Sequence, residues 1–134
     1  MKENIKELKI LLVEDDPISN FITKSKLNKV GAENVFETEN GQSAITFLEG
    51  ESPDLIFLDI NMPIMDGFEF LERCRQNRIW SLIPVVILTS SVRPCDKENA
   101  LEYSNVIGFL EKPLNQTKIE SIFLKYTSFK TNYM

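Results

Sequence analysis

The chain has 134 residues, a formal net charge of −5 and no histidine. This length is typical of a single domain, and 43% hydrophobic with 26% charged residues is the composition of an ordinary globular protein. The acidic balance argues against nucleic acid as a direct partner, because phosphate binding favours a basic surface. The absence of histidine excludes histidine-based catalytic triads, histidine metal ligands and a phosphohistidine formed on this chain.

Cys74 and Cys95 are too few for a disulfide framework and lie outside metal-ligand spacing, so we expect a reducing, cytoplasmic location. No apolar run approaches the ~20 residues of a membrane span, and no membrane association is expected. The expected organisation is a leader over residues 1–7, one domain over residues 8–127 and a short tail over residues 128–134.

Apolar segments alternate with segments of helical character along the whole chain. The expected strands are residues 8–13, 35–38, 55–58, 83–88 and 106–110. The expected helices are residues 17–31, 40–50, 66–76, 94–103 and 115–126. Five strands that alternate with five helices predict an α/β fold with a parallel sheet, right-handed crossovers and helices on both faces.

Two of the helix starts carry clear signals. Asp16 suits the cap of the first helix and Pro17 its first position. Asp66 and Glu69 form a pair like a capping box, and Gly67 allows tight backbone passage between them. Apolar residues then recur at roughly helical spacing after the first start: Ile18, Phe21, Ile22, Leu27 and Val30.

The segment Leu55–Leu58 organises the rest of the chain. Its four consecutive apolar residues do not alternate with polar ones, which predicts a strand covered on both faces. Asp59 follows directly. It is therefore expected at the carboxyl end of a central parallel strand, where open α/β sheets place their reaction sites.

Polar residues follow the other strands and are expected at the same edge of the sheet. The set comprises Glu14, Asp15, Asp16, Asp59, Asn61, Thr89, Ser90 and Lys112. Carboxylates gathered there without compensation would repel one another, so a cation is implied. Asp15, Asp16 and Asp59 are suitable oxygen ligands for Mg²⁺. The backbone carbonyl of Asn61 can add another ligand.

Beside bound Mg²⁺, an aspartate carboxylate can act as a nucleophile toward a phosphoryl group. An ammonium and a hydroxyl can stabilise the transferring oxygens, and Lys112 and Thr89 are available for this. Lys112 precedes Pro113, and an X-Pro bond is where a cis peptide costs little. The sequence does not determine which isomer is present.

Four motifs together resemble those of the receiver domain of two-component response regulators, the CheY-like family. They are Glu14-Asp15-Asp16, Leu58-Asp59-Ile60-Asn61-Met62-Pro63 with Asp66-Gly67, Leu88-Thr89-Ser90, and Glu111-Lys112-Pro113. The resemblance covers nearly the whole chain, and the combination is specific although no single motif is. It implies a flavodoxin-like, doubly wound fold with strand order 2-1-3-4-5.

By this resemblance Asp59 is the phosphoacceptor, Thr89 supplies the hydroxyl that follows the phosphoryl group, and Lys112 is its salt-bridge partner. The metal ligands implied for Mg²⁺, or Mn²⁺, are Asp15, Asp16, Asp59 and the backbone carbonyl of Asn61. A partner histidine kinase or histidine phosphotransfer protein supplies the phosphoryl group from its own histidine. A stand-alone receiver of this kind is not a turnover enzyme, and it carries out only Mg²⁺-dependent self-phosphorylation and autodephosphorylation.

The resemblance also implies a switch. Phosphorylation places a dianion at Asp59, and Thr89 and Lys112 lie on separate loops that can be drawn toward it. In the family this movement is coupled to an aromatic residue on the fifth strand, a place that Phe109 occupies. Many relatives carry Tyr there, so an inward state of Phe109 must rest on ring burial alone. The expected output is binding of another protein by the fourth helix, fifth strand and fifth helix, as a monomer or a phosphorylation-dependent dimer.

Two alternatives stay open. A receiver-fold adaptor that signals without phosphorylation is disfavoured by the intact Asp59, Thr89 and Lys112. A phosphatase with an aspartate nucleophile, as in the haloacid dehalogenase family, places an Asp-x-Asp pair after its first strand, whereas here the acceptor follows the third. Multiple turnover on phosphomonoesters would separate these. The sequence does not identify the kinase, the signal, the downstream target or the phosphoryl lifetime.

Overall fold

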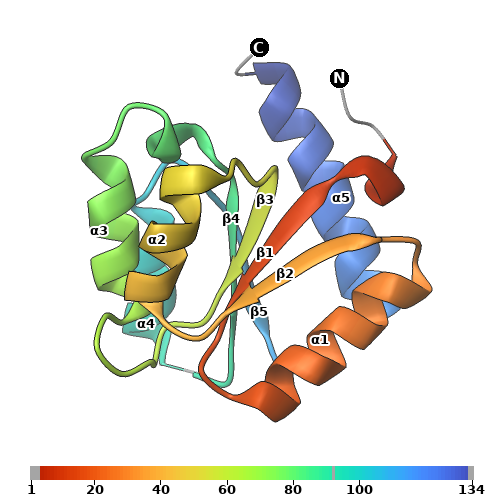
Figure 1. The fold of residues 1–134 in the computed structure, drawn as a ribbon, viewed down its shortest axis with the longest axis horizontal. Helices are drawn as coiled ribbons and strands as arrows, with labels where there is room; N and C mark the ends of the chain where they lie inside the picture. Colours follow the sequence, from red (N-terminus) through yellow and green to blue (C-terminus); the bar gives the residue numbers. More distant parts are fainter. Residues whose placement is uncertain (1–3, 92, 133–134) are drawn as a thin grey trace.

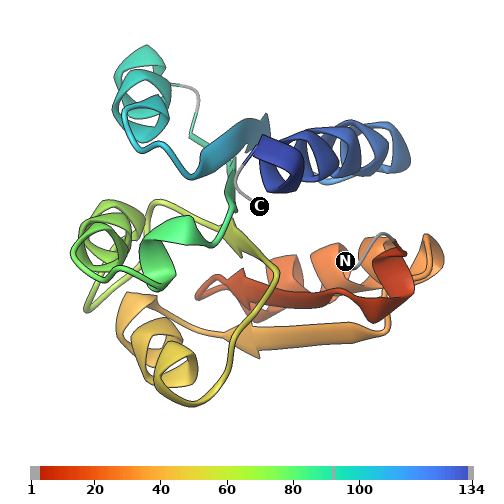
Figure 2. The ribbon, with the colours of Figure 1, turned by 90° about the horizontal axis from the view of Figure 1, so that it is seen from above.

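A five-stranded parallel sheet organises the computed structural model, which describes residues 4–91 and 93–132 (Figure 1). The strand order is β2-β1-β3-β4-β5, and every neighbouring pair is parallel. Viewed from above, α2, α3 and α4 lie on one side of the sheet and α1 and α5 on the other (Figure 2). The predicted flavodoxin-like order 2-1-3-4-5, with helices on both faces, is confirmed.

The strands are β1 (Lys9–Val13), β2 (Asn34–Thr38), β3 (Leu55–Leu58), β4 (Val85–Thr89) and β5 (Val106–Glu111). The α-helices are α1 (Pro17–Lys29), α2 (Gly41–Gly50), α3 (Gly67–Arg75), α4 (Pro94–Leu101) and α5 (Gln116–Asn132). Short 3₁₀ helices are η1 (Ile5–Glu7) and η2 (Trp80–Leu82). None of the helices in the described part of the chain has the length and apolarity needed to cross a membrane.

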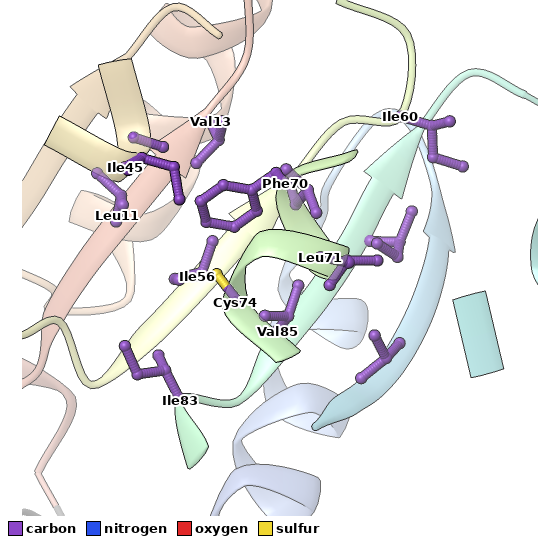
Figure 3. Packing of buried hydrophobic residues seen from close by; sticks show 14 of the residues in the cluster. Leu11, Val13, Ile45, Ile56, Ile60, Phe70, Leu71, Cys74, Ile83 and Val85 are labelled. Atoms are coloured by element: carbon purple, nitrogen blue, oxygen red, sulfur yellow. The ribbon is translucent and has the colours of Figure 1, made fainter. Parts of the chain in front are cut away.

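Alternate residues of the central strands supply two hydrophobic cores. Leu11 and Ile56 belong to the core under α2, α3 and α4, where they surround the fully buried Phe70 of α3 (Figure 3). Ile10 and Phe57 belong to the second core, under α1 and α5. Because both faces of β3 are covered, all four of its residues are buried, which confirms the strand predicted from the unbroken apolar run.

Helix α1 buries only part of the apolar set that its spacing suggests: Leu27 is fully buried, but the apolar residues of its first half are not. Ile18, Phe21 and Ile22 are 70%, 73% and 40% exposed, whereas the polar Asn20 and Thr23 face inward. The Asn20 side-chain amide donates to the backbone carbonyl of Glu14 at 3.0 Å. This hydrogen bond satisfies a buried backbone group of the loop after β1, and it explains why a polar side chain lies inward there.

The chain ends differ from the predicted boundaries. Residues 1–3 of the predicted leader and 133–134 of the predicted tail lie outside the described residues. The remaining leader forms η1, and Ile5 packs against the core under α1 and α5. At the other end, α5 continues past residue 127 to Asn132 and buries Phe129. The predicted boundary at residue 127 therefore falls inside a helix.

The start of α3 is fitted closely to the loop that follows β3. Asp66 and Glu69 form the predicted capping box. The Gly67 N–H donates to the carbonyl of Ile60 at 2.8 Å. A Cβ atom at Gly67 would lie 2.5 Å from the carbonyl oxygen of Asp59 and 2.8 Å from the Cα atom of Ile60. Only glycine permits this approach, which fixes the backbone on either side of Asp59.

We expect Gly67→Ala to lower the free energy of unfolding by about 1–3 kcal/mol, because the added methyl group meets backbone that cannot rotate away. Urea denaturation measures the change. Gly50→Ala is the matched control, since a Cβ atom there has nothing within 4 Å. It should be neutral or slightly stabilising, because alanine is the better helix former. Equal stability of Gly67→Ala and the wild type would contradict the close approach.

Candidate functional site

Asp59 lies at the carboxyl end of β3, where the neighbouring strands also end. Its N–H donates to the carbonyl of Val13 at 3.0 Å, which holds the residue beside β1. One carboxylate oxygen, Oδ1, accepts from the N–H of Ile60 at 2.7 Å. The other, Oδ2, lies 3.3 Å from the ammonium of Lys112. Asp59 is 7% exposed, so these partners, and not solvent, supply most of the contacts of its carboxylate.

Three carboxylates gather at this point. Glu14, Asp15 and Asp59 each place an oxygen within 4.8 Å of the others, the one such group of potential ligands found among the described residues. Glu14 and Asp59 are buried, and Asp15 is exposed. Carboxylate oxygens are the ligands that Mg²⁺ and Mn²⁺ prefer, and an exposed member leaves access for the waters that Mg²⁺ retains. The donor set therefore fits a hard divalent cation.

The structure does not bring the carboxylate of Asp16 into this cluster. Its Oδ1 accepts from the N–H of Ile18 at 2.9 Å, as the predicted cap of α1. Glu14, and not Asp16, lies in the cluster with Asp15 and Asp59. The strand ends could have indicated this in the sequence. Val13 pairs with Leu58 in the parallel register, so the residues that follow them, Glu14 and Asp59, are neighbours.

Lys112 reaches the cluster from the loop after β5, as predicted. Its ammonium forms ion pairs with Glu14 and Asp59. The Lys112 N–H donates to the carbonyl of Thr89 at 2.8 Å, and the Lys112–Pro113 bond is cis. Lys118 of α5, which the sequence analysis missed, donates from Nζ to the carbonyl of Pro113 at 3.0 Å and supports the same loop. In the sequence, a lysine one helical turn after the cap residue Asn115 could have indicated a side chain that reaches back to this loop.

Glu14 and Lys112 form an ion pair in which both pKa values are raised. Burial raises the pKa of Glu14 to about 7, against the opposing effect of the Lys112 ammonium, and the nearby Asp59 raises it further. Burial alone would lower the pKa of Lys112, but the hydrogen bond that its ammonium donates to Glu14 and the charge of Asp59 outweigh this effect, and the pKa is raised. Lys112 therefore remains a cation while Glu14 carries a proton more readily than a hydrated glutamate.

Thr89 and Phe109 lie on adjacent strands. Thr89 ends β4 and is fully buried, and its Oγ1 accepts from the N–H of Ser91 at 3.2 Å. Phe109 pairs with Ile87, two residues before Thr89, so both side chains lie on the same face of the sheet. Phe109 is half-buried against the core under α2, α3 and α4. The neighbours of the site, Asn61 and Ser90, are exposed.

The raised pKa of Glu14 predicts a loss of stability with rising pH in the presence of a chelator. Its carboxyl titrates near 4.5 when unfolded and near 7 when folded, so the folded state holds the proton more tightly between these values. We expect the free energy of unfolding to fall by on the order of 2 kcal/mol from about pH 5 to 7. Urea denaturation at fixed ionic strength measures it.

Glu14→Gln should remove this fall, and Glu49→Gln, at an exposed position of α2, should retain it. A fall of unchanged size in Glu14→Gln would assign the pH dependence to another group.

Comparison with known proteins identifies relatives of this chain. A model of the response regulator receiver domain matches residues 10–123. An uncharacterized 14.6 kDa protein of Leptolyngbya boryana is 32% identical, over 92% of this chain and 93% of its own. The sensor protein GacS of Pseudomonas syringae is 31% identical over 89% of this chain. That match covers 13% of GacS, so the chain spans about an eighth of the length of the first curated relatives that it matches.

Two solved structures that are similar to this chain contain a bound metal ion. The receiver domain of the sensor histidine kinase PA1611 from Pseudomonas aeruginosa has magnesium coordinated in its active site cleft. It is 26% identical with a TM-score of 0.79, and the match covers 90% of this chain and 98% of that one. The Mn²⁺-bound response regulator Rcp1 is 30% identical with a TM-score of 0.72, covering 91% and 93%.

Proposed function

Because the chain belongs to the family of response regulator receiver domains, we propose that it accepts a phosphoryl group on Asp59 and signals by phosphorylation-dependent binding of another protein. The observation that carries the proposal is the arrangement around Asp59. Its buried carboxylate contacts one ammonium, from Lys112, and lies within metal-ligand distance of two further carboxylates. The proposed acceptor Asp59, the Lys112 ammonium and the proposed metal ligands therefore lie together where a phosphoryl donor would bind.

We assign the metal ligands to Glu14, Asp15 and Asp59, with the backbone carbonyl of Asn61 as an additional ligand. We place Glu14 in the acidic pair instead of Asp16, because Glu14 belongs to the cluster of three carboxylates and Asp16, whose Oδ1 caps α1, does not. When bound, Mg²⁺ or Mn²⁺ would neutralise part of the acidic charge and polarise the phosphoryl oxygens. Receiver domains are in general signalling proteins, and no separate turnover substrate is proposed.

The residues of the chain divide the transfer step between them. An oxygen of Asp59 forms the new bond to phosphorus while the bond from phosphorus to the donor's histidine nitrogen breaks, and the nitrogen keeps the electron pair. The ammonium of Lys112 stabilises the charge that develops on the transferring oxygens. The Thr89 hydroxyl donates to the phosphoryl group after transfer. Phe109 responds by packing inward, which alters the surface of α4, β5 and α5.

Incubation with acetyl phosphate and Mg²⁺ should add one phosphoryl group, read by intact mass. The adduct should be absent from Asp59→Asn and in the presence of a chelator. Asp15→Asn should require a higher Mg²⁺ concentration, because it removes a ligand, whereas Asp16→Asn should react as the wild type does. A folded wild type without an adduct would favour the phosphorylation-independent adaptor. Asp16→Asn with the larger defect would restore Asp16 to the metal site.

A protein donor needs a surface beside the site, and α1 offers one. Ile18 and Ile22 line a depression of about 270 Å³ together with Lys112, Pro113 and Asp16, so it is continuous with the site. Phe21, 73% exposed, lies one helical turn from Ile18 on the same helix. Ile18, Phe21 and Ile22 are three and four residues apart and therefore share one side of the helix, and a contiguous exposed apolar patch marks a protein contact. We therefore propose that the histidine-bearing donor docks on α1.

Phe21→Asp should slow phosphoryl transfer from a donor protein by about tenfold or more, because a charge replaces an aromatic contact. The measurement uses the fastest donor in a panel of phosphorylated histidine phosphotransfer proteins. The rate with acetyl phosphate should not change. Leu124→Asp, at an equally exposed position of α5, is the matched control and should be neutral with both donors. An equal loss of rate with the donor protein and with acetyl phosphate would show that Phe21→Asp disturbs the fold or the site itself, and it would contradict docking on α1.

The proposed output remains the face made by α4, β5 and α5, with the chain acting in the cytoplasm as a monomer or a phosphorylation-dependent dimer. The phosphatase alternative is not favoured, because Asp59 follows the third strand and not the first.

A further inference from the structure

A chain of hydrogen bonds leads away from Thr89 to the start of α4. The N–H of Ser91 donates to Thr89 Oγ1 at 3.2 Å, and the Ser91 hydroxyl donates to Asp96 Oδ2 at 2.6 Å. The second oxygen of Asp96, Oδ1, accepts from the guanidinium of Arg93 at 3.0 Å. The Arg93 N–H lies 3.4 Å from the Ser91 hydroxyl. Both carboxylate oxygens of Asp96 are thus engaged with the loop that begins at Thr89.

Asp96 is also one of the residues that fix α4 to the rest of the molecule. Of the described residues of this helix, Asp96 and Ala100 are buried. Asp96 is 4% exposed, which is unusual for an aspartate, and Ala100 supplies little apolar area. The position of the first turn of α4 therefore depends on hydrogen bonds of Asp96 more than on hydrophobic packing.

The two contacts of Asp96 have different weights. Its ion pair with Arg93 joins the buried carboxylate to a guanidinium that is 71% exposed, so solvent screens this contact in part. The contact with Ser91 is shorter, at 2.6 Å, and involves a partly buried hydroxyl, which makes it the less screened and more directional of the two. Hydrogen bonding from Ser91, with help from Arg93, lowers the pKa of Asp96, so it is ionised at neutral pH.

We propose that Asp96 is a positioning residue for Thr89: through Ser91 it sets the resting place of the Thr89 hydroxyl and ties the start of α4 to it. This inference rests on the proposed function. When the Thr89 hydroxyl turns toward a phosphoryl group on Asp59, the Ser91 N–H must follow it or lose its acceptor. Because the Ser91 side chain is bound to Asp96, the displacement reaches the first turn of α4.

The test is hydrogen exchange at the amides of α4, with and without excess acetyl phosphate and Mg²⁺. In the wild type, phosphorylation should change these exchange rates by about tenfold or more. Ser91→Ala should lose most of this difference while Asp59 is still labelled, as intact mass will show. The variant keeps Asp96 and its pair with Arg93, and amide exchange without acetyl phosphate shows whether α4 is retained in its resting state. Ser91→Thr, which restores a hydroxyl, should restore the response.

Arg93→Ala is the matched control, because it removes the exposed partner of Asp96 and leaves Ser91 in place. It should respond as the wild type does. A full response of α4 in Ser91→Ala would overturn the inference, as would its loss in Arg93→Ala alone. Failure to label Asp59 even in the wild type would overturn the proposed function, and this inference with it.

Discussion

The contact of one lysine ammonium with two buried carboxylates is the interaction on which the site depends. Glu14 and Asp59 end neighbouring strands, and burial of both charges without a cation would be costly. Lys112 supplies that cation from the loop after β5, across the end of β4. Its single charge faces three carboxylates once Asp15 is included. The remaining negative charge is what makes the place suitable for a divalent ion, and it is the reason that a phosphoryl group would disturb the balance.

Much of this arrangement could be predicted, because it follows from where strands end. Asp59, Thr89 and Lys112 stand at or directly after apolar strands, and parallel strands bring their carboxyl ends to one edge. Asp15 and Asp16 were predicted as the acidic pair, whereas the carboxylates that cluster with Asp59 are those of Glu14 and Asp15. The register of β1 against β3 decides which residue stands beside Asp59. Register is a property of pairing, and composition alone does not contain it.

Helix α1 shows a second limit of sequence patterns. Periodicity correctly located the helix, since it reports which residues share a side. It does not indicate which buried backbone groups nearby need a hydrogen-bond partner. Asn20 is buried because the carbonyl of Glu14 needs a donor, and Phe21 is left outside as a result. The exposed apolar side chains of α1 thus follow from the hydrogen bond that the loop after β1 requires, and they place an apolar surface beside Lys112 of the site.

Helices α3 and α4 lie on the same face of the sheet but are held there by different forces. Phe70, Leu71 and Cys74 of α3 are all buried, so any shift of α3 would disrupt a close-packed core. Asp96 and Ala100 are the buried residues among those described in α4. A helix attached mainly by hydrogen bonds can move when those bonds rearrange, at little cost in buried apolar area. The hydrogen bonds in question begin at Thr89. This contrast in packing favours α4 over α3 as the element that responds to charge placed at Asp59.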